Sequence, residues 1–240
     1  MKKIPPTLLM VLLSFLSFSQ TWFDVGLKGG YGLNLMYNKN YFSDNNFTPK
    51  MSFGYMYGGK VGFNFNEDHS VTMDVISSAF NQGYYYNRLN ADSSRSNYSR
   101  SISFNSINIL LLYRKMKAAS YFEVGPQYSA ILKATGNDDI AGKSDVSGYL
   151  AKSYYSLALG FGGFVVGTEN FGVTIGFRFS YSLSDAISPE GKSVHFPSQT
   201  NYSSYSPTNP FTGIMVMELN YDLGFIAKAK CGKKTKFVMF

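Results

Sequence analysis

The stretch 171–182, FGVTIGFRFSYS, constrains the fold of this chain more than any other part of the sequence. A large apolar residue occupies every second position, and the positions between them hold Gly, Thr, Arg or Ser. A period of two predicts a β-strand with two unlike faces. The smaller, more polar face carries Arg178, which an ordinary core strand would not bury. A strand in the wall of a membrane barrel turns such a face toward the lumen.

Seven further stretches show a related alternation: 22–36, 52–64, 70–80, 102–113, 120–132, 153–166 and 213–227. The connections between the eight stretches are alternately long and short, as in outer-membrane barrels. The sequence therefore predicts an all-β fold, an eight-stranded antiparallel transmembrane β-barrel with up-and-down meander topology. A secreted sandwich or a lipocalin-like barrel is the alternative, which we disfavour because the polar face is rich in glycine and sparsely charged.

Two irregularities are expected within these strands. Ile102 and Phe104 share one parity, whereas the apolar residues from Ile107 onward share the other, so we predict a β-bulge near Asn105-Ser106. Pro126 cannot donate a hydrogen bond to a neighbouring strand, so a local disturbance of the ladder is predicted there.

Sequence features at the two termini predict that the protein is exported. Lys2 and Lys3 precede a short apolar run and small residues, which is the pattern of a signal peptide over residues 1–19. Residues 20–228 then form the barrel, and 229–240 form a lysine-rich periplasmic tail. Outer-membrane barrels keep both termini in the periplasm, so we predict an outer-membrane location with the long loops outside the cell.

The net charge of +7 does not indicate a nucleic-acid-binding protein. Two of the lysines lie in the predicted signal peptide, and five lie between residues 228 and 236; these seven account for the whole excess. The remaining body is neutral and offers no basic face to nucleic acid. Cys231 is the only cysteine and the two histidines are far apart, so neither a metal site nor a cofactor is predicted.

Charged residues within the predicted strands share the face opposite the apolar one. Because buried charges must be paired, we predict a lumen ion-pair network of these residues: Asp24, Lys28, Lys60, Asp74, Glu123, Arg178, Glu218 and Asp222. The network could be a structural plug, or it could line a gated narrow pore or proton path. The sequence favours the plug.

The predicted external loops hold several aromatic residues that the topology would expose: Tyr84, Tyr85, Tyr86, Tyr202 and Tyr205. They could capture a ligand, since tyrosine combines contact area with a polar group, or they could pack within the loops. His195, near Ser193, is the only candidate for catalysis, and no nucleophile motif accompanies it. We assign no catalytic residue and expect no enzymatic activity.

Several of these stretches resemble the PorT-like outer-membrane β-barrel family of Bacteroidetes. The resemblance is carried by INILLLYR (107–114), YFEVGPQYSAIL (121–132), LALGFGGF (157–164) and FGVTIGFRFSYSLSD (171–185). It implies an integral outer-membrane barrel and, through the founding member of the family, a link to type IX secretion.

The function predicted from the sequence is a structural or binding role exerted through the external loops. The alternatives are an accessory of a type IX secretion or gliding machinery, and a narrow small-solute pore. The expected partners are outer-membrane lipid and lipopolysaccharide and, through the tail, a periplasmic or secretion-machinery protein. We expect a monomer.

Overall fold

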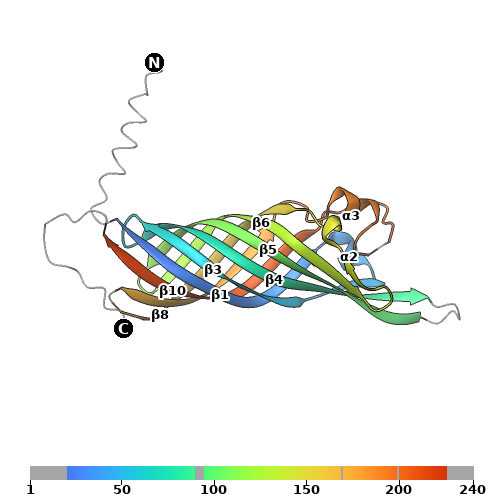
Figure 1. The fold of residues 1–240 in the computed structure, drawn as a ribbon, viewed down its shortest axis with the longest axis horizontal. Coiled ribbons are helices and arrows are strands. Elements are labelled where there is room, and N and C mark those ends of the chain that lie inside the picture. Colours follow the sequence, from blue (N-terminus) through green and yellow to red (C-terminus); the bar gives the residue numbers. More distant parts are fainter. Residues whose placement is uncertain (1–20, 90–94, 169, 199, 226–240) are drawn as a thin grey trace, which may run out of the picture.

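The computed structural model describes residues 21–89, 95–168, 170–198 and 200–225. Within them, eight long strands form the wall of a closed barrel (Figure 1): β1 (Trp22–Tyr37), β3 (Ser52–Asn64), β4 (His69–Leu89), β5 (Arg95–Lys117), β6 (Ser120–Asp138), β8 (Ser153–Gly167), β9 (Phe171–Ser182) and β10 (Asn209–Phe225). Each strand pairs antiparallel with the next, and β10 pairs with β1 to close the ring. The predicted eight-stranded antiparallel barrel is confirmed. The predicted signal peptide and lysine-rich tail lie outside the described residues.

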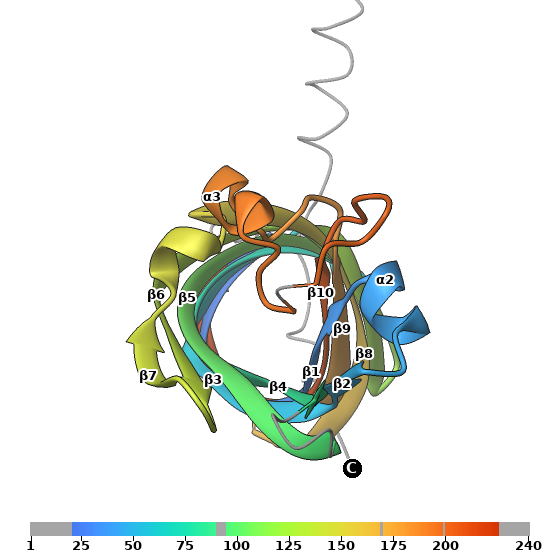
Figure 2. The same cartoon turned by 90° about the vertical axis from the view of Figure 1, so that its right-hand side faces the viewer.

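The two ends of the barrel differ in the length of their connections. At the end we call the turn end, short connections join β3 to β4, β5 to β6 and β8 to β9. The other end, the loop end, carries three short helices, α2 (Lys39–Ser43), η1 (Ser147–Tyr149) and α3 (Pro189–Ser193), and two short strands (Figure 2). Of these strands, β2 (Phe47–Lys50) pairs with β4 and β7 (Gly142–Asp145) pairs with β6.

Strands β4 and β5 are longer than predicted and continue past the other strands at the loop end (Figure 1). The long connection predicted between the stretches 70–80 and 102–113 is therefore wrong over most of its length, because the strand pairing runs on to Leu89↔Arg95. With β2 beside β4, this part of the barrel forms a three-stranded polar sheet. Its sequence lacks the apolar alternation of the wall because neither face has to contact lipid.

The predicted bulge near Asn105-Ser106 lies at the right level but in the neighbouring strand. The β5–β6 register shifts between Asn105 and Ser106, and the extra residue is Leu132 of β6. Leu132 and Lys133 are consequently both exposed on the outer surface. Ile102 and Phe104 of β5 face the lumen in unbroken register with the rest of their strand. Near Pro126, the β5–β6 pairing omits Leu111 and Leu112, as the proline predicts.

The outer surface of the barrel is apolar around its whole circumference. Large side chains that point outward remain exposed on every strand of the wall, among them Leu27 (66% exposed), Tyr57 (60%) and Tyr155 (61%). Such a continuous apolar surface is far larger than a soluble monomer exposes to water. In the part of the chain that the structure describes, no helix is long and apolar enough to span a membrane.

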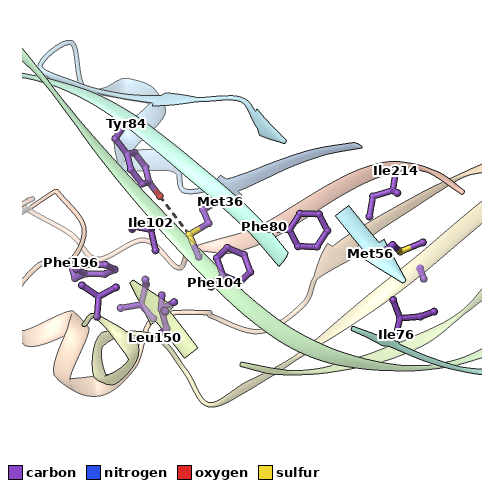
Figure 3. Close-up of a cluster of buried hydrophobic side chains, with 14 of the residues drawn as sticks. Met36, Met56, Ile76, Phe80, Tyr84, Ile102, Phe104, Leu150, Phe196 and Ile214 are labelled. Atoms are coloured by element: carbon purple, nitrogen blue, oxygen red, sulfur yellow. Dashed lines mark hydrogen bonds between the residues drawn. The ribbon is translucent and has the colours of Figure 1, made fainter. Parts of the chain in front are cut away.

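The lumen is filled by two layers. Charged side chains occupy the part nearer the turn end, and a cluster of apolar side chains occupies the part nearer the loop end (Figure 3). Met36, Phe80, Ile102 and Phe104 belong to this apolar cluster and are almost fully buried. The interior is therefore solid along most of its length, as in other eight-stranded barrels.

Candidate functional site

The charged layer is a network of eight buried side chains that come from seven of the eight wall strands. Its cations are Lys28, Lys60, Arg114 and Arg178, and its carboxylates are Asp24, Asp74, Glu123 and Glu218. All eight are at most 7% exposed. Four positive groups meet four negative groups, so the network is neutral and meets the requirement that buried charges be paired.

Glu218 of β10 is the carboxylate that contacts the most cations. Its Oε1 lies 2.7 Å from Lys60 Nζ, its Oε2 lies 3.2 Å from Lys28 Nζ, and Arg114 donates to both oxygens at 2.8 and 2.9 Å. Arg114 also donates to Glu123, whose other oxygen accepts from Arg178 at 2.6 Å. The bidentate arginine–carboxylate geometry fixes both partners.

Two of the residues in this region differ from the sequence prediction. The structure brings seven of the eight predicted residues together, but Asp222 is exposed near the turn end and forms no ion pair within the described residues. Arg114 was missing from the prediction because the strand was ended at Tyr113. Its parity could have revealed it, since every even-numbered residue from 102 to 114 faces the lumen.

A small cavity, with room for about one water molecule, lies above the charged layer. This cavity of about 20 Å³ lies between the charged layer and the apolar cluster, and Arg178, Asn108, Gln127 and Tyr154 are among its lining residues. The polar groups at this level largely bond to one another, as in the 2.8 Å contacts of Ser78 with Ser106 and Asn108. These hydrogen bonds join side chains of β4 and β5 within the lumen at this level.

The loops at the loop end are tied to one another across the mouth of the barrel. Tyr41 of α2 donates to the Phe196 carbonyl at 3.1 Å, and Asn38 donates to Thr208 at 2.9 Å. Tyr202 donates to Asp44 at 2.8 Å. Burial and this hydrogen bond raise the pKa of Tyr202 to about 12, so the phenol remains a donor at neutral pH. Residues 183–208 are thus fastened to residues 38–51.

A second tie links the extended β4–β5 sheet to β6. Arg100 donates to Asp138 at 2.7 Å, Tyr86 donates to the same carboxylate at 3.0 Å, and Arg100 also reaches the Pro197 carbonyl. Burial alone would raise the pKa of Asp138, but hydrogen bonds from the backbone of Ala141 and Ile140 and from Arg100 lower it to about 2. The carboxylate is therefore ionised throughout the neutral range and holds the arginine.

The five predicted external aromatics fall into three groups. Tyr84 is a correction: it is 1% exposed, faces the lumen, stacks on Phe47 at 4.8 Å and donates to the sulfur of Met36 (Figure 3). Tyr86 and Tyr202 are partly buried and take part in the ties described above. Tyr85 and Tyr205 are exposed. The hydroxyl of Tyr205 bonds to Asp185, which leaves Tyr85 as the exposed tyrosine whose hydroxyl has no hydrogen-bond partner among the described residues.

Tyr85 lies in an open hollow on the extended β2–β4–β5 sheet. The hollow has a volume of about 450 Å³, and its lining residues are all exposed and uncharged: Asn45, Asn46, Thr48, Tyr85, Asn87 and Asn97. Of these residues, the sequence indicated Tyr85 alone, because the asparagines have no signal beyond their number in two of the predicted long connections.

No catalytic or metal-binding arrangement forms among the described residues. His195 is exposed, and its side chain makes no hydrogen bond there to Ser193, Asp185 or Glu190. No group of three or more His, Cys, Asp or Glu side chains is placed to hold a metal ion within that part of the chain.

Comparisons with known proteins return structural similarity only. No protein-family model matches the chain, and no curated protein sequence matches it. Among solved structures, it is similar to the outer membrane protein OprG from Pseudomonas aeruginosa (12% identity, 86% of this chain and 98% of that chain covered, TM-score 0.43). It is also similar to neisserial surface protein A (12%, 83% and 96%, 0.41). A third similar structure is Ail, the attachment invasion locus protein of Yersinia pestis, in complex with a heparin analogue (15%, 83% and 99%, 0.41).

Proposed function

We propose that this protein is a closed, non-conducting barrel of the outer membrane that presents an ordered loop surface for binding outside the cell. The observation that carries the proposal is the sealed interior: a neutral ion-pair layer, an apolar layer above it, and loops tied across the mouth. In the proposed orientation, the accessible polar surface outside the cell is the loop end. We propose no enzymatic activity, because His195 makes no side-chain hydrogen bond to Ser193, Asp185 or Glu190 among the described residues.

The membrane location rests on the outer surface of the wall. Its apolar band is interrupted by charged side chains only toward the strand ends, with Lys115 and Lys117 at the turn end and Lys133 toward the loop end. Apolar side chains in this position contact lipid acyl chains, and lysines at the edges reach the headgroups. The bulge in β6 contributes to this pattern by placing Leu132 and Lys133 outward together. Lipopolysaccharide, with its phosphates, is the lipid we propose beside Lys133.

Cysteine labelling tests the location and the orientation. In a Cys231→Ser background the chain has no cysteine, so Lys143→Cys in β7 or Glu67→Cys in the β3–β4 turn adds a single reactive thiol. Both positions are exposed. A membrane-impermeant maleimide should label Lys143→Cys on intact cells, and Glu67→Cys only after the outer membrane is permeabilised. The reverse pattern, or labelling of protein that does not fractionate with the outer membrane, would contradict the proposal.

Planar-bilayer recording tests the absence of conductance. The purified, folded protein should show no unitary openings under conditions in which a porin added to the same bilayer conducts. The physical reason is that ions crossing the charged layer would have to displace side chains that are paired at 2.6–3.2 Å. Regular openings that are retained in the folded, heat-modifiable form would favour the small-solute pore instead.

Membership of the PorT-like family and a role in type IX secretion or gliding are separate proposals. They rest on the short sequence resemblances, and the tail that would contact a partner lies outside the described residues. Co-purification from mild detergent with and without residues 229–240 tests them, since a machinery component should lose a stoichiometric partner when the tail is removed.

A further inference from the structure

The outer face of the β2–β4–β5 sheet carries two short rows of polar side chains. The pairing places Thr48 beside Tyr85 and Tyr85 beside Ser99. In the next row Asn87 pairs with Asn97 and donates its backbone N–H to the Asn46 carbonyl at 2.9 Å. Cross-strand neighbours point to the same side of a sheet. The hollow described above is therefore a sheet surface, bounded by Asn45 at one side.

The four asparagines that line the hollow are free to bind. Among the described residues, the side-chain amides of Asn45, Asn46, Asn87 and Asn97 have no hydrogen-bond partner. Each amide offers two donor hydrogens and an acceptor oxygen in one plane. Tyr85 adds a half-exposed ring, and Lys50 Nζ lies 5.2 Å from the centre of that ring.

The strands that form the hollow are packed and hydrogen-bonded on their opposite face. On the opposite face of the same strands, Phe47 stacks on Tyr84, and Tyr86 is bonded to Asp138. The turn before β2 is fixed by Asp44, which accepts from the Asn46 backbone at 2.8 Å and from Tyr202. The backbone that carries the exposed amides is therefore supported before a ligand binds, which lowers the part of the entropic cost that comes from ordering the strands.

We propose that this hollow is a saccharide-binding site for a neutral oligosaccharide, a proposal that rests on the external placement of the loop end. Planar amides can bond to adjacent sugar hydroxyls as donor and acceptor together. The aliphatic C–H face of a sugar ring can pack on the Tyr85 ring.

The lining disfavours the other classes of ligand. Phosphate-rich ligands such as nucleic acids are held mainly by Lys and Arg, and none of the six lining residues is charged. A protein partner would need an apolar interface core with several large side chains, whereas this face offers one aromatic ring. Lys50 lies beside the Tyr85 ring and is not one of the lining residues. The site could therefore accept a sugar that carries an acidic substituent, but it does not require one.

The test is glycan-array binding followed by calorimetric titration. The full mature protein is folded in dodecyl-dimethylamine oxide, because the sugar headgroups of maltoside detergents would compete for the site. The array holds neutral hexasaccharides of glucose, mannose and galactose and a chondroitin sulfate hexasaccharide. Binding to a neutral hexasaccharide is expected.

Variants on the exposed face locate the site. Tyr85→Ala should weaken binding by about tenfold and Tyr85→Phe should retain it, because the ring and not the hydroxyl is proposed to carry the contact. Asn87→Ala and Asn97→Ala should each weaken binding several-fold. Asn81→Ala is the matched control: Asn81 is an exposed asparagine on the same face of β4 that does not line the hollow.

Three outcomes would overturn the proposal. Absence of binding to the array refutes the site, binding only to the sulfated sugar refutes the neutral ligand, and binding that survives Tyr85→Ala places the sugar elsewhere. Heat-modifiable gel migration shows that each variant is folded. The array measures binding by purified protein, so its result is independent of where the protein lies in the cell. If the protein binds sugar but is not found in the outer membrane, only the proposed location is refuted.

Discussion

Glu218→Gln is expected to lower the free energy of unfolding by about 3–5 kcal/mol, as for other buried ion pairs that lose one partner. The substitution keeps the shape of the side chain and removes only its charge. Lys28, Lys60 and Arg114, which contact Glu218 at 2.7–3.2 Å, would then share too little negative charge in a site without water access. Urea unfolding in lipid vesicles, followed by the fluorescence of the single Trp22, measures the change.

Asp222→Asn is the matched control for this prediction. Asp222 lies on the same strand and the same face, four residues further on, but it is exposed and has no ion pair within the described residues. Its change should stay within about 0.5 kcal/mol, as for ordinary surface positions. Equal effects of the two substitutions would mean that the network does not stabilise the barrel.

Gly125→Ala is expected to destabilise the barrel by about 1–3 kcal/mol or more, the cost of forcing extra atoms into a well-packed interior. A methyl group at this position would run into the backbone carbonyl of Leu111 in the neighbouring strand β5. This is the point where the pairing of β5 and β6 omits Leu111 and Leu112. A backbone atom cannot move aside as a flexible side chain can, so the two strands would have to separate.

Gly29→Ala provides the comparison, because a methyl group there meets nothing within 4 Å. It should change stability by no more than about 0.5 kcal/mol. The midpoint temperature of the heat-modifiable gel shift, taken for both variants beside the parent protein, reports the difference. If Gly125→Ala melts with the parent, then β5 and β6 are not in close contact at this level.

The strands could be predicted because one face of each is required to be apolar along the lipid-facing part of the wall. That requirement gave the eight alternating segments and placed seven of the network residues on the inner face. It also explains where prediction failed. Ile102, Phe104 and Tyr84 are apolar or aromatic but face the lumen, because the half of the lumen near the loop end is filled by an apolar cluster. In that half of the barrel, an apolar residue can face the lumen as well as the outer surface, so apolar character alone does not predict the direction of the side chain.

The features beyond the membrane band had weaker signals. The outer face of β4 and β5 near Asn87 and Asn97 is exposed and polar, so the composition of these segments resembles that of a loop. The hollow around Tyr85 depends on the pairing of three strands, so no local pattern in the sequence predicts it. By contrast, the alternation along β5 would have been enough to place Arg114 on the lumen face.

The distribution of the network among the strands has a consequence for how the barrel is assembled. Glu218 lies on β10, the last strand, while Lys28 and Lys60, two of its partners, lie on β1 and β3. Without β10, the four cations of the network have only three carboxylates as partners. A slip of β10 by two residues would carry Glu218 roughly 7 Å along the seam, out of reach of its partners. The pairing of Glu218 with its three cations therefore disfavours other registers of the closing seam, since these contacts form only when β10 is in register with β1.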